Sequence, residues 1–181
     1  MSFLDKLADV STIILDVDGV LTDSSVYILE DGVLMRKMST RDGFAIKYAI
    51  QQGYHIIVIT GGSSAGVTKR LVGLGVKQSD IYSGVHDKLE VLDELIETNQ
   101  IDLGRTAYMG DDLPDYECMR LVHLATSPVD AAPEVRDICH YISHLKGGEG
   151  CVRDLLEKIL RVQGQWIETH VVNLTNDQPE F

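Results

Sequence analysis

The segment Thr12-Ile-Ile-Leu-Asp-Val-Asp-Gly-Val-Leu-Thr22 decides the fold of this chain. Residues 12–15 form an apolar, largely β-branched run, which predicts a strand buried on both faces, as in parallel sheets. The run leads directly into two carboxylates, Asp16 and Asp18. In an open parallel sheet, ligands bind at the carboxyl ends of the strands. The segment therefore predicts a central strand that delivers acidic side chains to a binding site.

Similar short runs alternate with helical patterns along the chain. Residues 55–60 and 106–109 are typical of buried strands, and residues 80–82, 122–125 and 138–142 give weaker strand signals. Helical patterns lie between them, near residues 42–52, 64–73, 87–98, 113–120, 131–136 and 150–163. This alternation predicts an α/β fold with a doubly wound, mostly parallel sheet that helices cover on both faces.

Two segments fall outside the alternation. Residues 23–40 contain an Asp31-Gly32 pair between two apolar runs, which predicts a projecting β-hairpin. The hairpin is too short to be a domain, so we expect a single domain over residues 1–166. Residues 167–181 are polar and acidic towards their end, and we expect them to form a loose C-terminal tail.

The composition limits the class of protein and of partner. The chain has 181 residues, 44% of them hydrophobic, and can therefore bury a full core. Its 16 basic and 28 acidic residues give a net charge of −12, so we expect neither nucleic acid nor a membrane as a partner. No signal-peptide pattern opens the sequence, and three cysteines without a Cys-x-x-Cys spacing are typical of a reducing compartment. We therefore expect a cytoplasmic protein.

Further polar groups follow the other predicted strands. The stretch 60–64, Thr-Gly-Gly-Ser-Ser, places a hydroxyl and glycines before a helix, a geometry that binds anions. Lys88 begins a helix, where a cation is unfavourable unless it faces an anion. Residues 110–115, Gly-Asp-Asp-Leu-Pro-Asp, form a second acidic cluster on a strand-to-helix turn. Taken singly, helix capping explains Thr60 or Asp112, and a solvated helix face explains Lys88.

The first acidic pair has a second interpretation as half of a calcium loop. The acidic positions and the closing glutamate of an EF-hand are absent after Asp18, which argues against it. Two carboxylates at the end of an apolar strand repel each other and raise each other's pKa. A bound cation or a reaction is the better explanation for Asp16 and Asp18.

Four motifs in this order resemble those of the haloacid dehalogenase superfamily of phosphoryl-transfer enzymes. They are Asp16–Thr22, Thr60, Lys88 and Gly110–Asp112. Within the superfamily, the chain is most similar to the capless 3-deoxy-D-manno-octulosonate (KDO) 8-phosphate phosphatase family, at Ser39–Gly43, Gly110–Asp115 and Gly147–Arg153. The resemblance implies a Rossmann-like fold without a cap domain. It also implies a Mg²⁺-dependent phosphatase of a sugar-acid phosphate, KDO 8-phosphate, in the synthesis of lipopolysaccharide precursors.

The residues support a phosphatase mechanism. A phosphate dianion repels an oxygen nucleophile, so its charge must first be neutralised. Mg²⁺ held by Asp16, Asp111 and the backbone carbonyl of Asp18 would do so. Asp16 is then the nucleophile that forms an aspartyl phosphate. Asp18 is expected to protonate the leaving alkoxide and later to deprotonate water.

Other side chains are expected to assist this chemistry. Lys88 and Thr60 would hold the non-bridging oxygens of the phosphate. Asp112 and Asp115 would orient Asp111, Lys88 or a metal-bound water.

Substrate contacts follow from the resemblance. Five residues would line the site beside the phosphate: Ser39, Thr40, Arg41, Asp42 and Gly43. Asp18 and Lys88 would also contact the substrate there. Arg70 would bind the carboxylate of the substrate. The alternative interpretation is that Arg70 is a solvated residue on a helix surface. Many family members carry arginine after the Thr-Gly pair, whereas this chain has Gly62. A related phosphatase of nine-carbon sialic-type sugar-acid 9-phosphates carries an acid there, so that substrate class is the alternative.

Three rival interpretations are weighed against the phosphatase. A receiver-type signalling domain also gathers Asp, Thr and Lys at strand ends, but in a different order along the chain. A catalytically silent scaffold would not need the full set of motifs, and a sugar phosphomutase needs a cap domain to exclude water. Because no cap is encoded, we expect a homotetramer in which a neighbouring subunit closes each site over the hairpin of residues 23–40.

Overall fold

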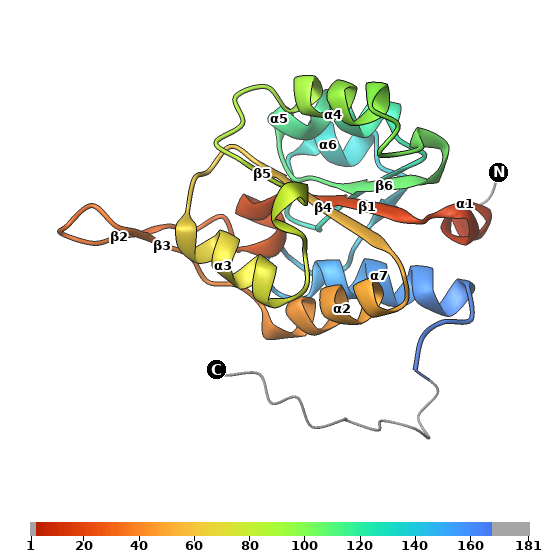
Figure 1. The fold of residues 1–181 in the computed structure, drawn as a ribbon, viewed down its shortest axis with the longest axis horizontal. Helices are drawn as coiled ribbons and strands as arrows, with labels where there is room; N and C mark the ends of the chain where they lie inside the picture. Colours follow the sequence, from red (N-terminus) through yellow and green to blue (C-terminus); the bar gives the residue numbers. More distant parts are fainter. Residues whose placement is uncertain (1–2, 168–181) are drawn as a thin grey trace.

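The central strand β1 (Thr12–Leu15) organises a six-stranded parallel sheet in the computed structural model, which describes residues 3–167 (Figure 1). The strand order is β5-β4-β1-β6-β7-β8, and β1 pairs in parallel with both of its neighbours. The other strands are β4 (His55–Thr60), β5 (Ile81–Ser83), β6 (Thr106–Met109), β7 (Leu124–Ser127) and β8 (Tyr141–Ile142). The predicted α/β fold with a parallel sheet is confirmed.

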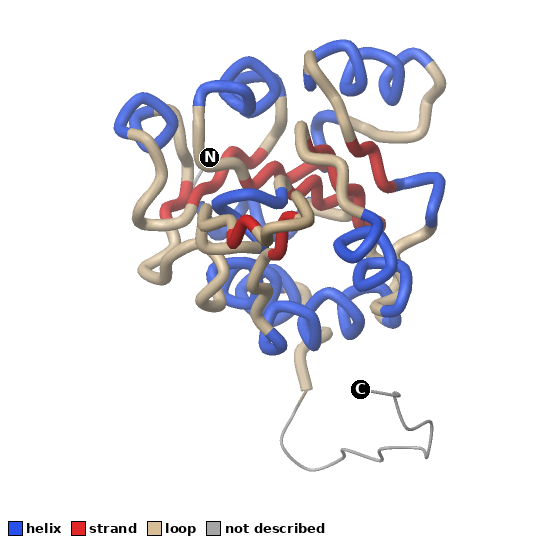
Figure 2. Tube along the Cα trace, turned by 90° about the vertical axis from the view of Figure 1, so that its left-hand side faces the viewer, coloured by secondary structure: helices blue, strands red, loops and turns tan. Residues whose placement is uncertain are grey.

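Helices cover both faces of the sheet and bury its alternating side chains (Figures 1 and 2). Ile13 and Leu15 point into one apolar core, and Ile14 points into the other. The first core is packed by α1 (Phe3–Asp9), α2 (Thr40–Gln51), α3 (Ala65–Gly73) and α7 (Cys151–Val162). The second core is packed by α4 (Lys88–Glu97), α5 (Leu113–Leu121) and α6 (Pro133–Asp137).

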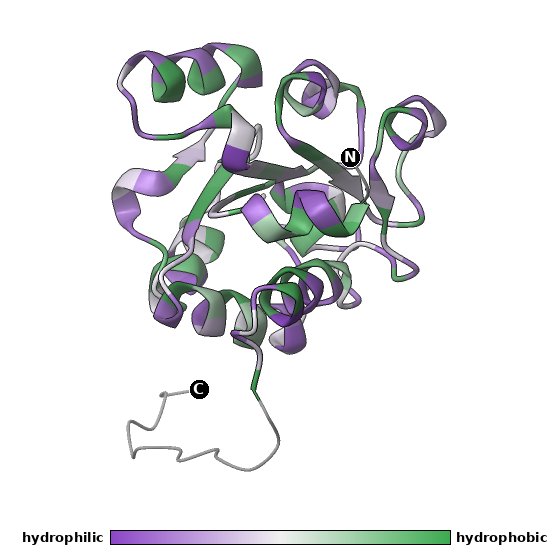
Figure 3. Cartoon of the chain, turned by 90° about the vertical axis from the view of Figure 1, so that its right-hand side faces the viewer, coloured by the Kyte–Doolittle hydropathy of each residue, from purple (hydrophilic) through white to green (hydrophobic). Residues whose placement is uncertain are grey.

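The helices carry both hydrophilic and hydrophobic residues, as amphipathic helices on a sheet must (Figure 3). No helix within residues 3–167 has both the length and the apolar character that crossing a bilayer requires.

The hairpin expected within residues 23–40 is present and projects from the body of the molecule (Figure 1). Strands β2 (Tyr27–Ile28) and β3 (Leu34–Met35) pair antiparallel, with Tyr27 opposite Met35. Gly32, at φ +81°, takes the left-handed conformation that the turn between them requires. An isolated bridge between Thr22 and Met38 closes the base of the hairpin.

Several element boundaries differ from the sequence prediction. Helix α1 was not expected at all, and β7 starts at Leu124 rather than at 122. Helix α2 starts at Thr40 because the Ser39 hydroxyl accepts a hydrogen bond from the backbone N–H of Asp42, whereas the apolar pattern begins only later. The C-terminal tail predicted over 167–181 lies, beyond residue 167, outside the described residues.

The glycine loop before α7 packs against the turn that follows β1. A Cβ atom on Gly147 would lie 2.0 Å from the carbonyl oxygen of Gly19, so only glycine fits there. Gly148 donates its N–H to the carbonyl of Val20 at 2.9 Å, and the buried Cys151 thiol lies 3.3 Å from the same oxygen. The loop therefore helps to complete the fold of its own chain.

Asp154 on α7 gives a pH-dependent contribution to stability. Burial opposes its ionisation, but hydrogen bonds from Lys158, Tyr141 and Ser143 outweigh burial and lower the pKa of Asp154 below its usual value. A lowered folded-state pKa stabilises the fold above the unfolded value of 3.8, and this stabilisation is lost as the pH falls through the folded value. Asp154→Asn should therefore destabilise the protein at pH 7 by about 2 kcal/mol.

Urea denaturation of both proteins at pH 7 and at about pH 3 measures this effect, since Asp titrates in this range. The difference in unfolding free energy should shrink at the lower pH. Asp137→Asn, at an exposed position of α6, is the matched control and should change stability little. An equal loss at both pH values would contradict the assignment to ionised Asp154.

Candidate active site

Asp16 lies at the carboxyl end of β1, where the chain turns sharply. Its buried carboxylate follows Leu15, and the next residues fold back in a tight turn over Val17–Leu21. Gly19 in this turn has φ +99°, a conformation that favours glycine. A Cβ atom there would lie 1.9 Å from Oδ2 of Asp111. Glycine is therefore what allows the turn after β1 and the loop after β6 to meet.

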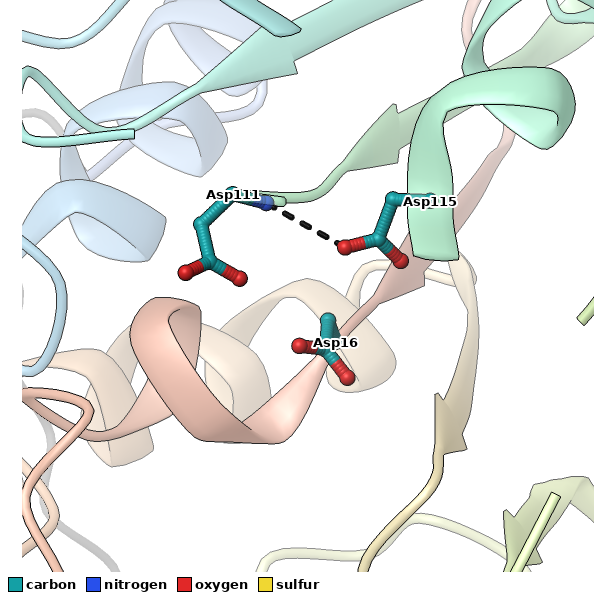
Figure 4. Close-up of side chains that lie close together, drawn as sticks. All are labelled: Asp16, Asp111 and Asp115. Carbon is teal, nitrogen blue, oxygen red and sulfur yellow. Dashed lines mark hydrogen bonds between the residues drawn. The ribbon is translucent and has the colours of Figure 1, made fainter. Parts of the chain in front are cut away.

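Three carboxylates converge at this point (Figure 4). Asp111 follows β6, Asp115 stands on the first turn of α5, and each offers an oxygen within 4.8 Å of one from Asp16. The Asp115 carboxylate is held firmly, since its Oδ2 accepts from the Asp111 N–H at 3.2 Å and its Oδ1 from the Tyr108 hydroxyl at 2.7 Å. The parallel neighbours β1 and β6 thus place an acidic cluster at one edge of the sheet.

Lys88 supplies the positive charge of the cluster. It is the first residue of α4, and its ammonium lies 2.8 Å from Oδ1 of Asp16 and 2.6 Å from Oδ1 of Asp115. Burial opposes its charge, but the two carboxylates raise the pKa of Lys88 above its ordinary value. The sequence argument that a lysine at a helix start faces an anion therefore describes this residue correctly.

The cluster carries more negative charge than Lys88 alone can balance. Burial and the charge of Asp115 raise the pKa of Asp16 to about 6, against the opposing effect of Lys88. Burial, together with the charges of Asp16, Asp115 and Asp112, raises the pKa of Asp111 to about 8. Hard divalent cations prefer carboxylate oxygens, so this donor set fits Mg²⁺. Asp16 and Asp111 offer free lone pairs, whereas Asp115 is already occupied by its hydrogen bonds.

Asp18 and Thr60 lie beside the cluster and line a small hollow with Gly62. Thr60 ends β4, and its hydroxyl oxygen accepts from the Gly62 N–H at 3.2 Å. The Asp18 carboxylate is paired with Arg36 of the hairpin. Its side chain is therefore no member of the three-carboxylate cluster, and the ligand role predicted for its backbone carbonyl stays a prediction.

Asp112 caps helix α5, and its predicted contact with a metal-bound water stays a prediction. It is exposed, and its carboxylate accepts from the Leu113 N–H at 2.8 Å, which makes it the N-cap of α5. A capping side chain is held by its own helix, so Asp112 contributes to the charge near Asp111 without bonding to it. Asp115, the other residue predicted to orient its neighbours, contacts both Lys88 and Asp111.

The segment Ser39–Gly43 forms the cap and first turn of α2, and its residues point in different directions. Asp42 is buried and accepts from the Arg153 N–H at 2.7 Å, so it fastens α2 to α7 and does not line the hollow. Arg41 borders a separate groove along α7, and Thr40 is exposed. Arg41 and Asp42 thus lie away from the hollow lined by Asp18 and Thr60, since helix geometry turns successive side chains about 100° apart, and their predicted contacts with the substrate stay predictions.

Arg70 and Gly43 do come together. A Cβ atom on Gly43 would lie 2.8 Å from an Nη atom of Arg70, so the guanidinium rests on the glycine. Arg70 borders a hollow of about 620 Å³ between the hairpin and α3. Arg70 is exposed, so both its predicted contact with an anion and its alternative as a solvated helix residue stay open.

Sequence reasoning missed Arg36 and Tyr108. Arg36 lies just after β3, in the otherwise apolar run Val33-Leu-Met-Arg36, and lines both the small hollow and the larger one. A charged residue in an apolar hairpin strand is a signal that could have drawn attention to it. Tyr108, inside β6, has no such signal, because an aromatic residue in a buried strand is usual.

Known proteins resemble the chain over most of its length. It is 33% identical over 162 residues to the KDO 8-phosphate phosphatase KdsC of Salmonella typhi, covering 90% of this chain and 85% of the relative. It is 34% identical over 160 residues to KdsC of Yersinia pestis, covering 88% of this chain and 84% of that protein. The chain belongs to the KDO 8-phosphate phosphatase family. No protein-family model matches it.

Solved structures of KDO 8-phosphate phosphatases and their relatives share the fold. A probable YrbI family phosphatase from Pseudomonas syringae superposes with a TM-score of 0.85 at 38% identity, covering 90% of this chain and 91% of that one. The KDO 8-phosphate phosphatase of Moraxella catarrhalis, in complex with magnesium, phosphate and KDO, superposes with a TM-score of 0.84 at 34% identity, covering 89% of this chain and 91% of that one. The expected membership of the haloacid dehalogenase superfamily is confirmed.

Proposed function

We propose that the protein is a Mg²⁺-dependent phosphoric monoester hydrolase that converts KDO 8-phosphate to KDO and phosphate in lipopolysaccharide precursor synthesis. The observation that carries the proposal is the buried Asp16–Lys88 pair beside Asp111, at the end of the central strand. A carboxylate oxygen, a cation and an acidic metal cluster are together what phosphoryl transfer to an aspartate requires. Membership of the KDO 8-phosphate phosphatase family supports the choice of substrate.

The first half-reaction uses three side chains. Lys88 and the Thr60 hydroxyl bind non-bridging phosphate oxygens, and Lys88 also screens the charge of Asp16. A carboxylate oxygen of Asp16 attacks phosphorus, and the bond from phosphorus to the sugar oxygen breaks. The departing alkoxide takes a proton from Asp18, which leaves an aspartyl phosphate and the free sugar acid.

The second half-reaction returns the enzyme to its starting state. Asp18, now a carboxylate, removes a proton from a water molecule as the water oxygen attacks phosphorus. The bond between phosphorus and Asp16 breaks, releasing phosphate. Mg²⁺ bound by Asp16 and Asp111 would neutralise the phosphate charge in both steps. Asp115 holds Lys88 and Asp111 in position through its two oxygens.

A phosphate-release screen tests the proposal. The panel contains KDO 8-phosphate, nine-carbon sugar-acid 9-phosphates, hexose phosphates and nucleotides, each assayed with Mg²⁺. A preference for KDO 8-phosphate is the expected result. Equal activity on unrelated phosphates would reduce the function to a phosphatase of undetermined substrate, and a preference for the nine-carbon compounds would assign that class instead. Absence of steady phosphate release would favour a receiver-type signalling domain.

We further propose that the active protein is a cytoplasmic homotetramer, joined through the hairpin. The hairpin of a single chain leaves apolar side chains in water, with Ile28 77% and Tyr27 62% exposed. Apolar patches and unpaired strand edges of this kind are normally covered by another chain. The three cysteines are unpaired, as expected in a reducing compartment. In the absence of a cap domain, a neighbouring subunit that closes the site would exclude water from it.

Ile28→Asp should separate the subunits. A charge in the centre of an apolar contact costs about 2 kcal/mol or more, the scale of an interface hot spot. We expect sedimentation equilibrium at assay concentration to show smaller species, with reduced turnover. Leu4→Asp is the matched control, since Leu4 is 61% exposed on α1, at the opposite end of the molecule from the hairpin (Figure 1). A fully active wild-type monomer would contradict the proposal.

A further inference from the structure

Arg36 connects the hairpin to the active site. Its side chain is only 8% exposed, although it stands at the base of a projecting ribbon. Nε lies 2.6 Å from Oδ1 of Asp18 and one Nη lies 3.1 Å from Oδ2, a two-bond ion pair. The other nitrogen, Nη1, is buried and has no hydrogen-bond partner among the described residues. Buried guanidinium donors normally have acceptors, so this nitrogen points to a missing ligand.

The Arg36–Asp18 pair engages both oxygens of Asp18. Oδ1 also accepts from the Thr22 hydroxyl at 3.4 Å. To hand a proton to the leaving oxygen of a substrate, Asp18 must turn at least one oxygen towards it, and Arg36 must release that oxygen. The Arg36 side chain is the buried member of the pair, at 8% exposed against 34% for Asp18, and a buried charge that loses its partner is costly unless another acceptor replaces it. The substrate is therefore expected to bring an anionic group to Arg36.

The surroundings of Arg36 indicate which anionic group this is. The phosphate is occupied by Lys88 and Thr60 in the proposed mechanism. Arg36 also borders the hollow of about 620 Å³, whose wall includes Arg70. Two guanidinium groups thus line one cavity next to the phosphate site. A planar guanidinium fork suits a carboxylate, which it can bind through two hydrogen bonds.

We propose that Arg36 is a specificity-determining residue that exchanges Asp18 for the carboxylate of the sugar-acid substrate. Binding of the correct substrate draws the guanidinium away and frees Asp18 for proton transfer, and a sugar phosphate without a carboxylate leaves the pair closed. Recognition of the acid and readiness of the catalytic group are thereby coupled. This inference rests on the proposed function and names Arg36 as the residue that selects substrates with a carboxylate.

Gly62 is consistent with this role. A Cβ atom at position 62 would lie 3.2 Å from an Nη of Arg36 and 3.1 Å from Oδ2 of Asp18. Such contacts are tighter than ordinary van der Waals separations, so a side chain there would crowd the pair. The glycine after Thr60-Gly61 leaves the room that the guanidinium of the hairpin occupies.

The test compares Arg36→Met with the wild-type enzyme on three phosphates. KDO 8-phosphate has a carboxylate, a hexose 6-phosphate has none, and para-nitrophenyl phosphate has a leaving group that needs no general acid. We expect kcat/KM for KDO 8-phosphate to fall at least about 30-fold, corresponding to the loss of a buried charge pair. The rate on the hexose 6-phosphate should rise, because Arg36 no longer holds Asp18, and the rate on para-nitrophenyl phosphate should change less than about threefold. Arg36→Lys should recover only part of the loss, because a lysine lacks the fork.

Inhibition by KDO measures binding of the sugar acid without requiring hydrolysis of KDO 8-phosphate. As a competitive inhibitor of para-nitrophenyl phosphate hydrolysis, it should bind Arg36→Met at least about tenfold more weakly than wild type. Arg120→Met is the charge-matched control, because Arg120 is exposed on α5, and it should behave as wild type. Preserved para-nitrophenyl phosphate hydrolysis also shows that the variant is folded.

Two results would overturn the proposal for Arg36. Equal losses on all three substrates would assign it a structural role, and an undiminished rate on KDO 8-phosphate would show that its guanidinium is not needed. Failure of the proposed function is seen separately, because the wild-type enzyme would then show no preference for KDO 8-phosphate over the hexose 6-phosphate. In that case there is no carboxylate selection for Arg36 to perform, and the exchange is also excluded.

Discussion

Asp16→Asn is expected to abolish phosphate release from every substrate. A carboxamide is not a nucleophile towards phosphorus, and it lacks the charge that a Mg²⁺ ligand supplies. The side chain keeps its shape and still accepts a hydrogen bond from Lys88, which lies 2.8 Å away in the native protein. The variant should therefore fold normally. Steady-state phosphate release, together with circular dichroism and a thermal melt, measures both expectations.

Chelation provides an independent test of the same chemistry. Wild-type enzyme in excess EDTA should lose its activity and regain it when Mg²⁺ is added. The control variant is Asp9→Asn, at an exposed residue of α1, which should keep full activity. Phosphate release by Asp16→Asn in EDTA would exclude the aspartyl-phosphate mechanism for this protein.

Lys88→Met should have the second largest effect. Lys88 is the cation shared by Asp16 and Asp115, and its side chain is 5% exposed. Its removal leaves two buried carboxylates facing each other, which costs about 3 kcal/mol of stability. Loss of a charge that meets the phosphate should reduce kcat by about 10³-fold, the scale of one electrostatic donor.

Lys88→Met is measured by phosphate release and by urea denaturation at pH 7. Lys47→Met, which removes an exposed lysine from α2, controls for the change in net charge. Because Lys88 lowers the pKa of Asp16, Asp16 in the variant takes up its proton at a higher pH than the native value of about 6, so the stability loss of Lys88→Met should be largest at high pH and smallest below about pH 6. A variant with native kcat would show that Lys88 is a structural cation only.

The fold could be predicted from local patterns because its strands are continuous apolar runs. β1, β4 and β6 have the predicted limits. The short edge strands were placed less well: of the segment 138–142, only Tyr141 and Ile142 pair in the sheet. Edge strands are determined by which neighbour they meet, and a single sequence does not record that neighbour.

The acidic cluster could be predicted because strand ends of a parallel sheet meet at one edge. Asp16, Asp111 and Lys88 lie together as the order of motifs indicated. Contacts that depend on side-chain direction could not be predicted: Asp42 accepts from the Arg153 N–H of α7, and Asp112 caps its own helix. The contact between Arg36 and Asp18 joins a hairpin to a strand end, and no periodicity in the sequence encodes such a contact.

The close packing of Gly147 against Gly19 has a consequence for the order in which the protein folds during synthesis. The turn after β1 is made before the loop that packs on it, which is encoded more than a hundred residues later, with Cys151 and Val20 separated by 131 positions. Contacts so distant in sequence form late, because the intervening chain must first be closed. A nascent chain that ends before Gly147 therefore holds Asp16 and Asp18 on an unsupported turn. Competence for phosphoryl transfer therefore requires that the segment from Gly147 to Cys151 has been made.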